Sequence, residues 1–244
     1  MKILLNGACG RMGREIEKLV SASEAHEIAA GVDKMANVGG YTDINDFNGE
    51  ADVIIDFSNH LGTAELLDYA VERNIPAVIA TTGHTDDEVK NIEKAAEKIA
   101  VFHSANMSLG VALLVELAVK TAAVMPDADI EIVETHHNRK LDAPSGTALM
   151  IANAIKKVRE KAEFKLGRAG SAKREKNEIG IHAVRRGNIA GIHEVLVSTD
   201  TQTITLKHEA HSRALFAEGA ISAAEFLAGK PAGLYDMNSI IRGE

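Results

Sequence analysis

The stretch that decides the fold is KILLNGACGRMGREIEKLV, residues 2–20. Residues 2–6 form an apolar run typical of a buried strand, and apolar side chains recur at helical spacing after the turn. Gly7, Gly10 and Gly13 stand between the two elements at the spacing G-x-x-G-x-x-G. A pyrophosphate approaches a backbone closely only where side chains are absent, and a helix N-terminus offers it unpaired N–H groups. We therefore expect a dinucleotide-binding turn here, with a plain glycine turn as the alternative.

Strands and helices alternate beyond this turn. Apolar runs predict strands at 27–32, 51–57, 75–80 and 99–103, with helices at 61–73 and 85–99 between them. This alternation is typical of a parallel sheet with helices on both faces. The expected fold class of residues 1–106 is α/β, a Rossmann-type dinucleotide-binding domain.

The pattern changes after residue 106. Helices are expected at about 108–125, 146–161 and 212–228, strands at 129–135, 179–185, 191–198 and 202–208, and an exposed basic loop at 167–178. The strands of this part are not separated by regular crossover helices. Residues 107–212 are therefore expected to form an α+β substrate-binding domain with a mostly antiparallel or mixed sheet.

An acidic residue follows the second expected strand. Asp33 lies 26 positions after Gly7 (33 − 7), and a carboxylate there would accept hydrogen bonds from the 2′-OH of NAD. Lys34 beside it could instead pair with the 2′-phosphate of NADP. A solvated loop is the alternative for both residues. Cys9, inside the glycine turn, is interpreted as a packing or spacer residue rather than a nucleophile.

Two later strand ends are further candidates for the cofactor. Residues 80–82 (Ala-Thr-Thr) end one strand, and residues 104–107 (Ser-Ala-Asn-Met) end the next. Ligands of open parallel sheets bind outside the carboxyl ends of the strands. Ordinary loops remain the alternative at both places.

The second stretch with a chemical signature is ETHHNRKLDAPSGTA, residues 134–148. A metal site is disfavoured because no H-E-x-x-H or cysteine pair accompanies the histidines. A hydrolase nucleophile is disfavoured because Ser145 lacks the first glycine of a G-x-S-x-G elbow. A solvated basic surface and an anion-binding site remain.

The anion-binding interpretation explains more of these residues. Ser145 is a plausible N-cap, and the N–H groups of Gly146 and Thr147, with the Thr147 hydroxyl, would meet a carboxylate. Lys140 can return to the same place as a charged partner. His136 suits a proton donor, since an imidazole titrates near pH ~6.5. A nucleotide domain beside such a site predicts a reductase.

The composition of the chain argues against several classes of protein. The chain has 244 residues, 45% hydrophobic content and a formal net charge of −8, which argues against general nucleic-acid binding. No apolar run reaches the ~18–20 residues that a membrane span needs. The single Cys9 excludes an intramolecular disulfide and suits a reducing compartment. We expect a cytoplasmic globular protein without a bound metal.

These residues resemble the 4-hydroxy-tetrahydrodipicolinate reductase (dihydrodipicolinate reductase) family. Residues 134–148 are similar, without a gap, to its signature E-x-H-H-x-x-K-x-D-A-P-S-G-T-A. NGACGRMG, ATTG, SANMSLGV, HEAHSRALFAEGA and GLYDM are similar to further family segments, in the same order. The resemblance covers nearly the whole chain.

The resemblance implies hydride transfer from NADH or NADPH to C4 of a cyclic unsaturated imine dicarboxylate, with loss of water, in diaminopimelate and lysine biosynthesis. His136 would donate the proton with Lys140 assisting, and the substrate would contact His137, Ser145, Gly146 and Thr147. The implied cofactor contacts are Gly7, Ala8, Cys9, Gly10, Arg11, Met12, Asp33, Lys34, Ala80, Thr81, Thr82, Ser104, Ala105, Asn106 and Met107.

The resemblance further implies a homotetramer built through the substrate-domain sheet, with residues 213–244 returning to the N-terminal domain. Three positions depart from the family pattern: His84 and Met107 replace aromatic residues beside the nicotinamide site, and Ala112 replaces an asparagine. Another two-domain NAD(P)-dependent dehydrogenase, such as an amino-acid dehydrogenase, and a non-catalytic dinucleotide sensor are the rival functions.

Overall fold

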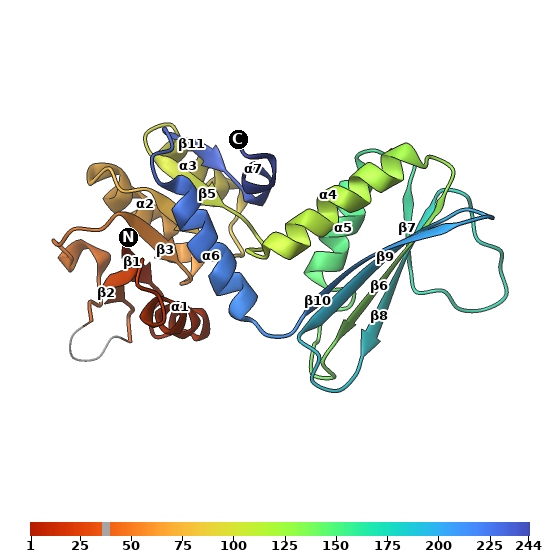
Figure 1. Cartoon of the computed structure of the whole chain (residues 1–244), viewed down its shortest axis with the longest axis horizontal. Helices are drawn as coiled ribbons and strands as arrows, with labels where there is room; N and C mark the ends of the chain where they lie inside the picture. The colour runs from red at the N-terminus through yellow and green to blue at the C-terminus, as the bar shows by residue number, and fades with distance from the viewer. Residues whose placement is uncertain (36–39) are drawn as a thin grey trace. The chain divides into compact units, whose positions relative to one another are not determined.

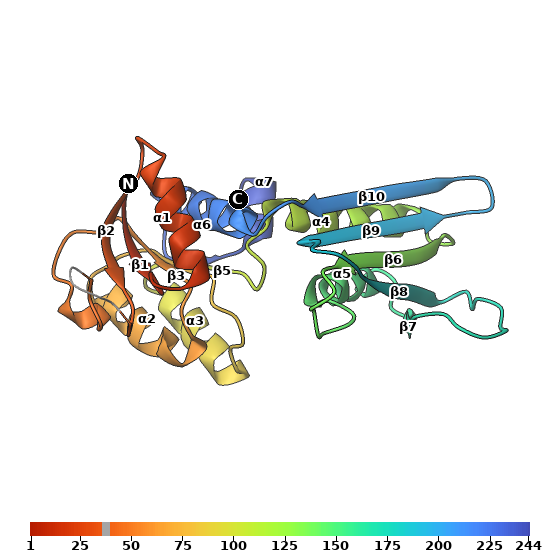
Figure 2. The ribbon, with the colours of Figure 1, turned by 90° about the horizontal axis from the view of Figure 1, so that it is seen from below.

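A computed structural model describes residues 1–35 and 40–244. The chain forms two compact units: Met1–Leu109 with Arg213–Glu244, and Gly110–Ser212 (Figures 1 and 2). The first unit is therefore built from two separate parts of the chain, and both termini belong to it.

The first unit contains a parallel sheet of six strands. They are β1 (Lys2–Asn6), β2 (Glu27–Val32), β3 (Val53–Asp56), β4 (Ala77–Ile79), β5 (Ala100–His103) and β11 (Gly233–Tyr235), in the order β11-β5-β4-β3-β1-β2. The chain leaves β1 toward β2 on one side and returns to β3 on the other, which makes the end of β1 a topological switch point. The predicted Rossmann-type α/β fold is confirmed.

Helices cover both faces of this sheet. They are α1 (Arg11–Ser21), α2 (Thr63–Glu72), α3 (Asp86–Ala96), α6 (Ala214–Leu227) and α7 (Met237–Arg242), with short 3-10 turns at Ile44–Asp46 and His60–Gly62. Leu4, Ile54 and Val101 point into a core shared with α2 and α3. Successive strand side chains alternate between faces; accordingly Phe102, next to Val101, contacts Phe226 of α6 on the opposite side.

The second unit is a five-stranded mixed sheet. It comprises β6 (Asp129–His136), β7 (Glu163–Leu166), β8 (Glu178–Arg185), β9 (Gly191–Ser198) and β10 (Thr203–Ala210), in the order β10-β9-β6-β8-β7. The central strand β6 runs antiparallel to β9 and parallel to β8. The helices α4 (Leu109–Val124) and α5 (Gly146–Lys156) pack on one face, around a core of isoleucine, valine and alanine (Figure 1). The predicted mixed sheet is confirmed.

Three short elements were not expected from the sequence: β7, β11 and α7. In addition, α5 ends at Lys156 rather than near residue 161, because the chain turns and Arg159 donates to main-chain carbonyls at the end of α4. The basic segment 167–178 does form the connection from β7 to β8. Arg174 anchors that connection by ion pairs with Asp129 and Glu131 of β6.

Candidate functional site

The glycine turn occupies the switch point of the first sheet. Gly7 has φ +82°, and a Cβ atom on it would lie 2.4 Å from the Phe57 carbonyl oxygen. A Cβ on Gly13 would lie 2.4 Å from the Gly7 carbonyl oxygen, so α1 packs against the turn at a distance only glycine permits. Gly10 is the N-cap of α1 and supplies no side-chain cap. This bare helix terminus fits the pyrophosphate of a dinucleotide.

Asp33 is tied to this turn by its carboxylate. Oδ2 accepts a hydrogen bond from the Cys9 N–H at 3.0 Å, and Oδ1 accepts one from the Met35 N–H at 2.9 Å. The carboxylate is thereby oriented at the end of β2, beside the glycine turn. Lys34, the next residue, is exposed, and so is Arg11 at the start of α1.

The other predicted cofactor residues follow β4 and β5 along the same edge of the sheet. Thr81 is buried, and its hydroxyl accepts a hydrogen bond from the Ser58 N–H at 2.9 Å. Ser104 closes its own loop by donating to the Asn106 carbonyl at 2.9 Å. Met107 lies in the interior, with its carbonyl against Gly219 of α6. The predicted cofactor residues thus follow the carboxyl ends of β1, β2, β4 and β5, and Ala8, Ala80, Thr81 and Met107 among them are buried.

That edge also carries a row of three imidazoles that the sequence did not bring together. The rings of His60 and His84 are 6.2 Å apart, and those of His84 and His103 are 5.3 Å apart, both edge to face. Burial lowers the pKa of His84 and of His103, so both rings favour the neutral form. His60 pairs with Glu88 at 2.9 Å. Within residues 1–35 and 40–244, no group of three or more His, Cys, Asp or Glu side chains is arranged to hold a metal ion.

Strand register assembles the candidate catalytic group in the second unit. On β6, Ile130 and Ile132 face the helices, and Glu134 and His136 continue the same face because side chains alternate along a strand. His193 on β9 is the register partner of Glu134, and Arg185 on β8 is the partner of His136. The apolar face of the sheet therefore becomes a polar group where β6 ends.

Glu134 is the centre of this group and is 0% exposed. Its carboxylate accepts from His136 Nδ1 at 2.6 Å, from the Ser145 N–H at 3.0 Å, and from the two terminal guanidinium nitrogens of Arg185 at 2.8 and 2.7 Å. Burial opposes a charge on Glu134, but the hydrogen bonds from Arg185, His136 and Ser145 outweigh it. The pKa of Glu134 consequently lies below its ordinary value, and the carboxylate is ionised.

His193 supports the turn at the start of α5. Its Nε2 lies 3.1 Å from the Ser145 hydroxyl, which also accepts from the Ala148 N–H at 3.2 Å. Ser145 is therefore the N-cap that the sequence predicted. Burial, together with nearby His136, lowers the pKa of His193 to about 4. His193 is thus a neutral structural imidazole at the back of the site.

The predicted substrate residues surround the start of α5. Gly146 is exposed, and a Cβ atom on it would meet nothing within 4 Å, so the main chain there is open to a ligand. Lys140 is mostly buried and pairs with Asp142 at 2.9 Å. His137 is half-buried, and its main-chain N–H donates to the Ile189 carbonyl. Arg139 is exposed and binds Asn188 at 2.6 Å, away from the buried group.

Comparisons with known proteins place this geometry in one family. Residues 1–107 match the family model described as "Dihydrodipicolinate reductase, N-terminus", and residues 110–241 match "Dihydrodipicolinate reductase, C-terminus". The chain belongs to the dihydrodipicolinate reductase family. Members of this family named 4-hydroxy-tetrahydrodipicolinate reductase include one from Caldanaerobacter subterraneus, 46% identical over 99% of this chain and 98% of its own length. Another, from Clostridium novyi, is 43% identical over 100% and 99%.

A solved structure extends the likeness to three dimensions. The dipicolinate-bound dihydrodipicolinate reductase from Paenisporosarcina sp. TG-14 has a TM-score of 0.85 and 26% identity, covering 98% of each chain. The fold of this dihydrodipicolinate reductase family member is therefore that of the family throughout both units. The family's dinucleotide-binding domain makes it an NAD(P)H-dependent oxidoreductase.

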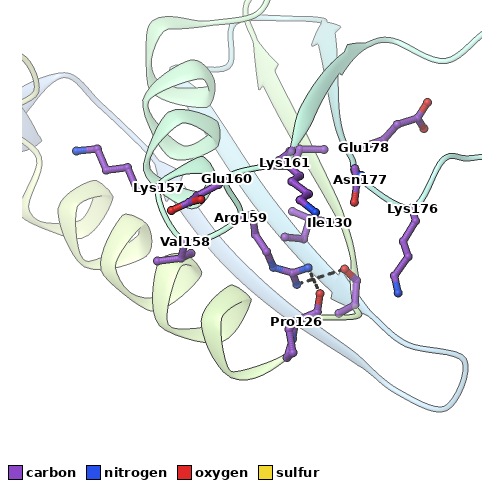
Figure 3. A pocket seen from close by; sticks show the side chains of 13 residues that line it. Pro126, Ile130, Lys157, Val158, Arg159, Glu160, Lys161, Lys176, Asn177 and Glu178 are labelled. Atoms are coloured by element: carbon purple, nitrogen blue, oxygen red, sulfur yellow. Dashed lines mark hydrogen bonds between the residues drawn. The ribbon is translucent and has the colours of Figure 1, made fainter.

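A cavity of about 620 Å³ in the second unit is separate from the group around Glu134 (Figure 3). It lies between the end of α5 and the starts of β6 and β8. Figure 3 shows Arg159 in its wall reaching toward Pro126, and Arg159 also donates to the carbonyls of Ala122 and Met125. Lys176 at its rim pairs with Asp127. Arg159 therefore binds the carbonyls at the carboxyl end of α4, where a cation complements the helix dipole.

Sequence reasoning missed three members of the site: Glu134, Arg185 and His193. Glu134 could have been found, because it stands two residues before His136 on a strand and so shares its face. Arg185 and His193 come from other strands. Their positions depend on the register of β8 and β9 against β6, which no local pattern in the sequence reveals.

Proposed function

We propose that this chain reduces 4-hydroxy-tetrahydrodipicolinate, via dihydrodipicolinate, to tetrahydrodipicolinate with NAD(P)H, in diaminopimelate and lysine biosynthesis. The observation that carries the proposal is the buried His136, paired with an ionised carboxylate beside the open turn at Ser145–Thr147. This arrangement suits a reaction that adds a proton to an anionic substrate. The names of the full-length relatives support the same activity.

The proposed roles in the second unit follow from this geometry. The N–H groups of Gly146 and Thr147, at the positive end of α5, bind a carboxylate of the cyclic substrate. Lys140 supplies further positive charge to this dicarboxylate, and His137 supplies a hydrogen bond. His136 gives its proton to the electron pair that hydride addition displaces, with Lys140 assisting. The dipicolinate in the related solved structure is a cyclic dicarboxylate of this kind.

The proposed cofactor site is the edge of the first sheet. When bound, NADH or NADPH supplies the hydride that adds to C4 of the substrate. The turn at Gly7–Met12 holds the pyrophosphate, and the loops at Ala80–Thr82 and Ser104–Met107 hold the nicotinamide half. The oriented carboxylate of Asp33 favours the ribose hydroxyls of NADH, and exposed Lys34 favours the 2′-phosphate of NADPH. We propose that both nucleotides serve as donors.

We further propose that the protein is a homotetramer of 26.0 kDa chains assembled through the second sheet, and that it acts in the cytoplasm. The face of this sheet opposite α4 and α5 carries Val133, Val184 and Leu196, of which Val184 is 38% exposed. Contact between copies would remove these apolar side chains from water. Within the described residues, no helix is long and apolar enough to cross a membrane. Light scattering after size-exclusion chromatography tests the assembly.

The activity is tested by a coupled assay. Dihydrodipicolinate synthase, pyruvate and aspartate semialdehyde generate the substrate, and oxidation of NADH and NADPH is followed in parallel. Substrate-dependent loss of absorbance is expected with both nucleotides. No loss with either nucleotide would refute the proposed activity. If the protein instead oxidises the nucleotides only in a mixture whose product is an amino acid, another dehydrogenase of the same architecture is favoured.

A further inference from the structure

We propose that Glu134 is the positioning residue of the proton donor: its carboxylate keeps a proton on Nδ1 of His136, so that Nε2 is the nitrogen that gives its proton to the substrate. This inference rests on the proposed function for the identity of the substrate. The state of His136 that it requires is a property of the free protein.

The hydrogen-bond capacity of Glu134 decides which nitrogen of His136 carries a proton. An ionised carboxylate can only accept hydrogen bonds, and Glu134 receives four of them, from His136, Ser145 and both terminal nitrogens of Arg185. The 2.6 Å contact with Nδ1 of His136 is consequently an N–H donation by the imidazole. In a neutral ring whose Nδ1 carries the proton, Nε2 is unprotonated and can accept the next proton.

The other nitrogen of His136, Nε2, lies beside a glycine. A Cβ atom on Gly191 of β9 would lie 3.1 Å from Nε2 of His136. Glycine at this position therefore leaves Nε2 unobstructed from that side, while Nδ1 faces the carboxylate. The two nitrogens of His136 thus have different surroundings: Nδ1 is bound to a carboxylate, and Nε2 faces a glycine.

Arg185 keeps Glu134 charged. The bidentate guanidinium offsets the cost of burying the carboxylate, and Arg185 also donates to the Asp142 carbonyl at 2.7 Å. The hydrogen bond from Nδ1 of His136 to this carboxylate keeps the ring from rotating or changing tautomer when the proton on Nε2 is transferred.

Glu134 also connects the proton donor to the turn at the start of α5. Glu134 accepts from the Ser145 N–H at 3.0 Å, and Ser145 is the N-cap of α5. One buried carboxylate thus fixes both His136 and the residue that starts the turn of Gly146 and Thr147. The distance between proton donor and bound carboxylate is set through a single side chain.

A structural role is the alternative explanation of Glu134. In that case the residue merely neutralises Arg185, and its loss would weaken the fold and lower activity regardless of what stands at position 136. Two groups that act as one unit are instead strongly non-additive. A double-mutant cycle therefore separates the two explanations.

The kinetic test compares Glu134→Gln, His136→Gln and the double variant in the full chain. In the wild-type background, Glu134→Gln should lower kcat about 100-fold, within the ~10²–10⁴-fold range of general acid catalysis, and change KM less than about threefold. In the His136→Gln background the same change should cost less than about twofold in kcat. An equal loss in both backgrounds, or an unchanged kcat in the first, overturns the proposal.

The matched control is Glu131→Gln. Glu131 lies on the same strand and pairs with a histidine and an arginine, His182 at 2.7 Å and Arg174 at 3.1 Å, but on the opposite face of the sheet. It should keep kcat within about twofold of the wild-type value, with the assembly state measured alongside. Glu134→Asp is the second variant, since it retains the charge beside Arg185 and withdraws the carboxylate from His136. It should also lower kcat with little change in KM.

A measurement without substrate keeps this inference separate from the proposed function. Nitrogen-15 chemical shifts of labelled histidines in the wild-type protein report which imidazole nitrogens carry protons. The signals of His136 are assigned as those that disappear in His136→Gln. They should show a proton on Nδ1. A bare Nδ1 with the proton on Nε2 overturns the proposal even if the coupled assay succeeds. A protonated Nδ1 in a protein that fails the coupled assay refutes only the proposed substrate.

Discussion

Glu134, which is buried, and Arg185, which is partly buried, form an ion pair, and a buried ion pair adds little to stability in itself. Desolvation of two charges offsets most of their attraction, whereas removal of one partner leaves the other uncompensated, at about 3–5 kcal/mol. Here the pair is joined to His136 and Ser145 by hydrogen bonds. At the scale of single residues, the pair is therefore better explained by the geometry that it imposes on its neighbours than by the stability it provides.

His193 should make stability depend on pH in the weakly acidic range. Burial lowers its pKa to about 4 from 6.5, so between these values the unfolded chain binds a proton that the folded chain does not. The resulting stability is fully present above pH 6.5 and is lost as pH falls toward 4, by about 3 kcal/mol at roughly 1.4 kcal/mol per pKa unit. Urea unfolding at pH 7.5 and 4.5 measures this loss.

The comparison for this prediction is His193→Gln, which has no imidazole to titrate. Its free energy of unfolding should fall less between the two pH values than that of the wild type, by about 2–3 kcal/mol. His211→Gln, which removes an exposed imidazole, should behave like the wild type. Equal losses in the wild type and His193→Gln would contradict the low pKa of His193.

Asp33 and Lys34 should affect the two nucleotides in opposite ways. Asp33→Asn weakens hydrogen bonds to the ribose hydroxyls and should raise KM for NADH about tenfold, with a smaller effect on NADPH. Lys34→Met removes the cation near the 2′-phosphate and should raise KM for NADPH about tenfold while leaving NADH unaffected. Hydrogen bonds to charged groups contribute ~1.5–3 kcal/mol, which covers a tenfold change. Steady-state kinetics with each nucleotide measures both effects.

Lys18→Met is the control, since Lys18 is exposed in the last turn of α1, at the other end from the glycine turn. It should change neither KM. If Asp33→Asn or Lys34→Met raises KM equally for NADH and NADPH, these residues maintain the loop rather than distinguish the two nucleotides.

At the scale of elements, the contact of α1 with the turn after β1 depends on the absence of one side chain. Gly13→Ala places a Cβ atom 2.4 Å from the Gly7 carbonyl oxygen and 2.5 Å from that of Ala8. Both atoms are main chain and cannot rotate away, so α1 must shift. We expect a loss of about 1–3 kcal/mol in the free energy of unfolding, typical of overpacking, and a higher KM for the cofactor.

Gly62→Ala provides the control for that loss, because a Cβ atom there meets nothing within 4 Å. It should change the free energy of unfolding by less than about 0.5 kcal/mol. Denaturant unfolding of the two variants side by side gives the comparison. A Gly13→Ala protein as stable as Gly62→Ala would show that α1 does not pack tightly on the turn.

The elements that could be predicted from the sequence are those whose signal is local. The glycine turn, the apolar strands of the first sheet and the N-cap at Ser145 depend on neighbours within a few residues. The strands β7 and β11 are four and three residues long, which is too short for a hydrophobic period to appear. Both are edge strands, and they form only by pairing with a neighbouring strand. The group around Glu134 escaped prediction for a related reason, since it is assembled by pairing between strands.

At the scale of the whole molecule, the two units divide the reactants in the function that we propose. The glycine turn belongs to the first unit and the group around Glu134 to the second, and each unit has its own core. A ligand that binds one unit should stabilise that unit, because binding to the native state adds RT ln(1 + [L]/Kd) to its stability. Amide hydrogen exchange of the full chain reports this protection segment by segment.

Dipicolinate and NADH should therefore slow exchange in different places. Dipicolinate, a cyclic dicarboxylate, should protect the start of α5 at Ser145–Ala148 and the end of β6. NADH should protect the glycine turn and the loops after β4 and β5. At a ligand concentration of 100 Kd the protected amides should exchange about 100-fold more slowly where they open together with the binding site. Gly146→Pro, which removes an N–H from the start of α5, should abolish the protection by dipicolinate and leave the protection by NADH unchanged. Protection of the glycine turn by dipicolinate in the absence of NADH would contradict this division.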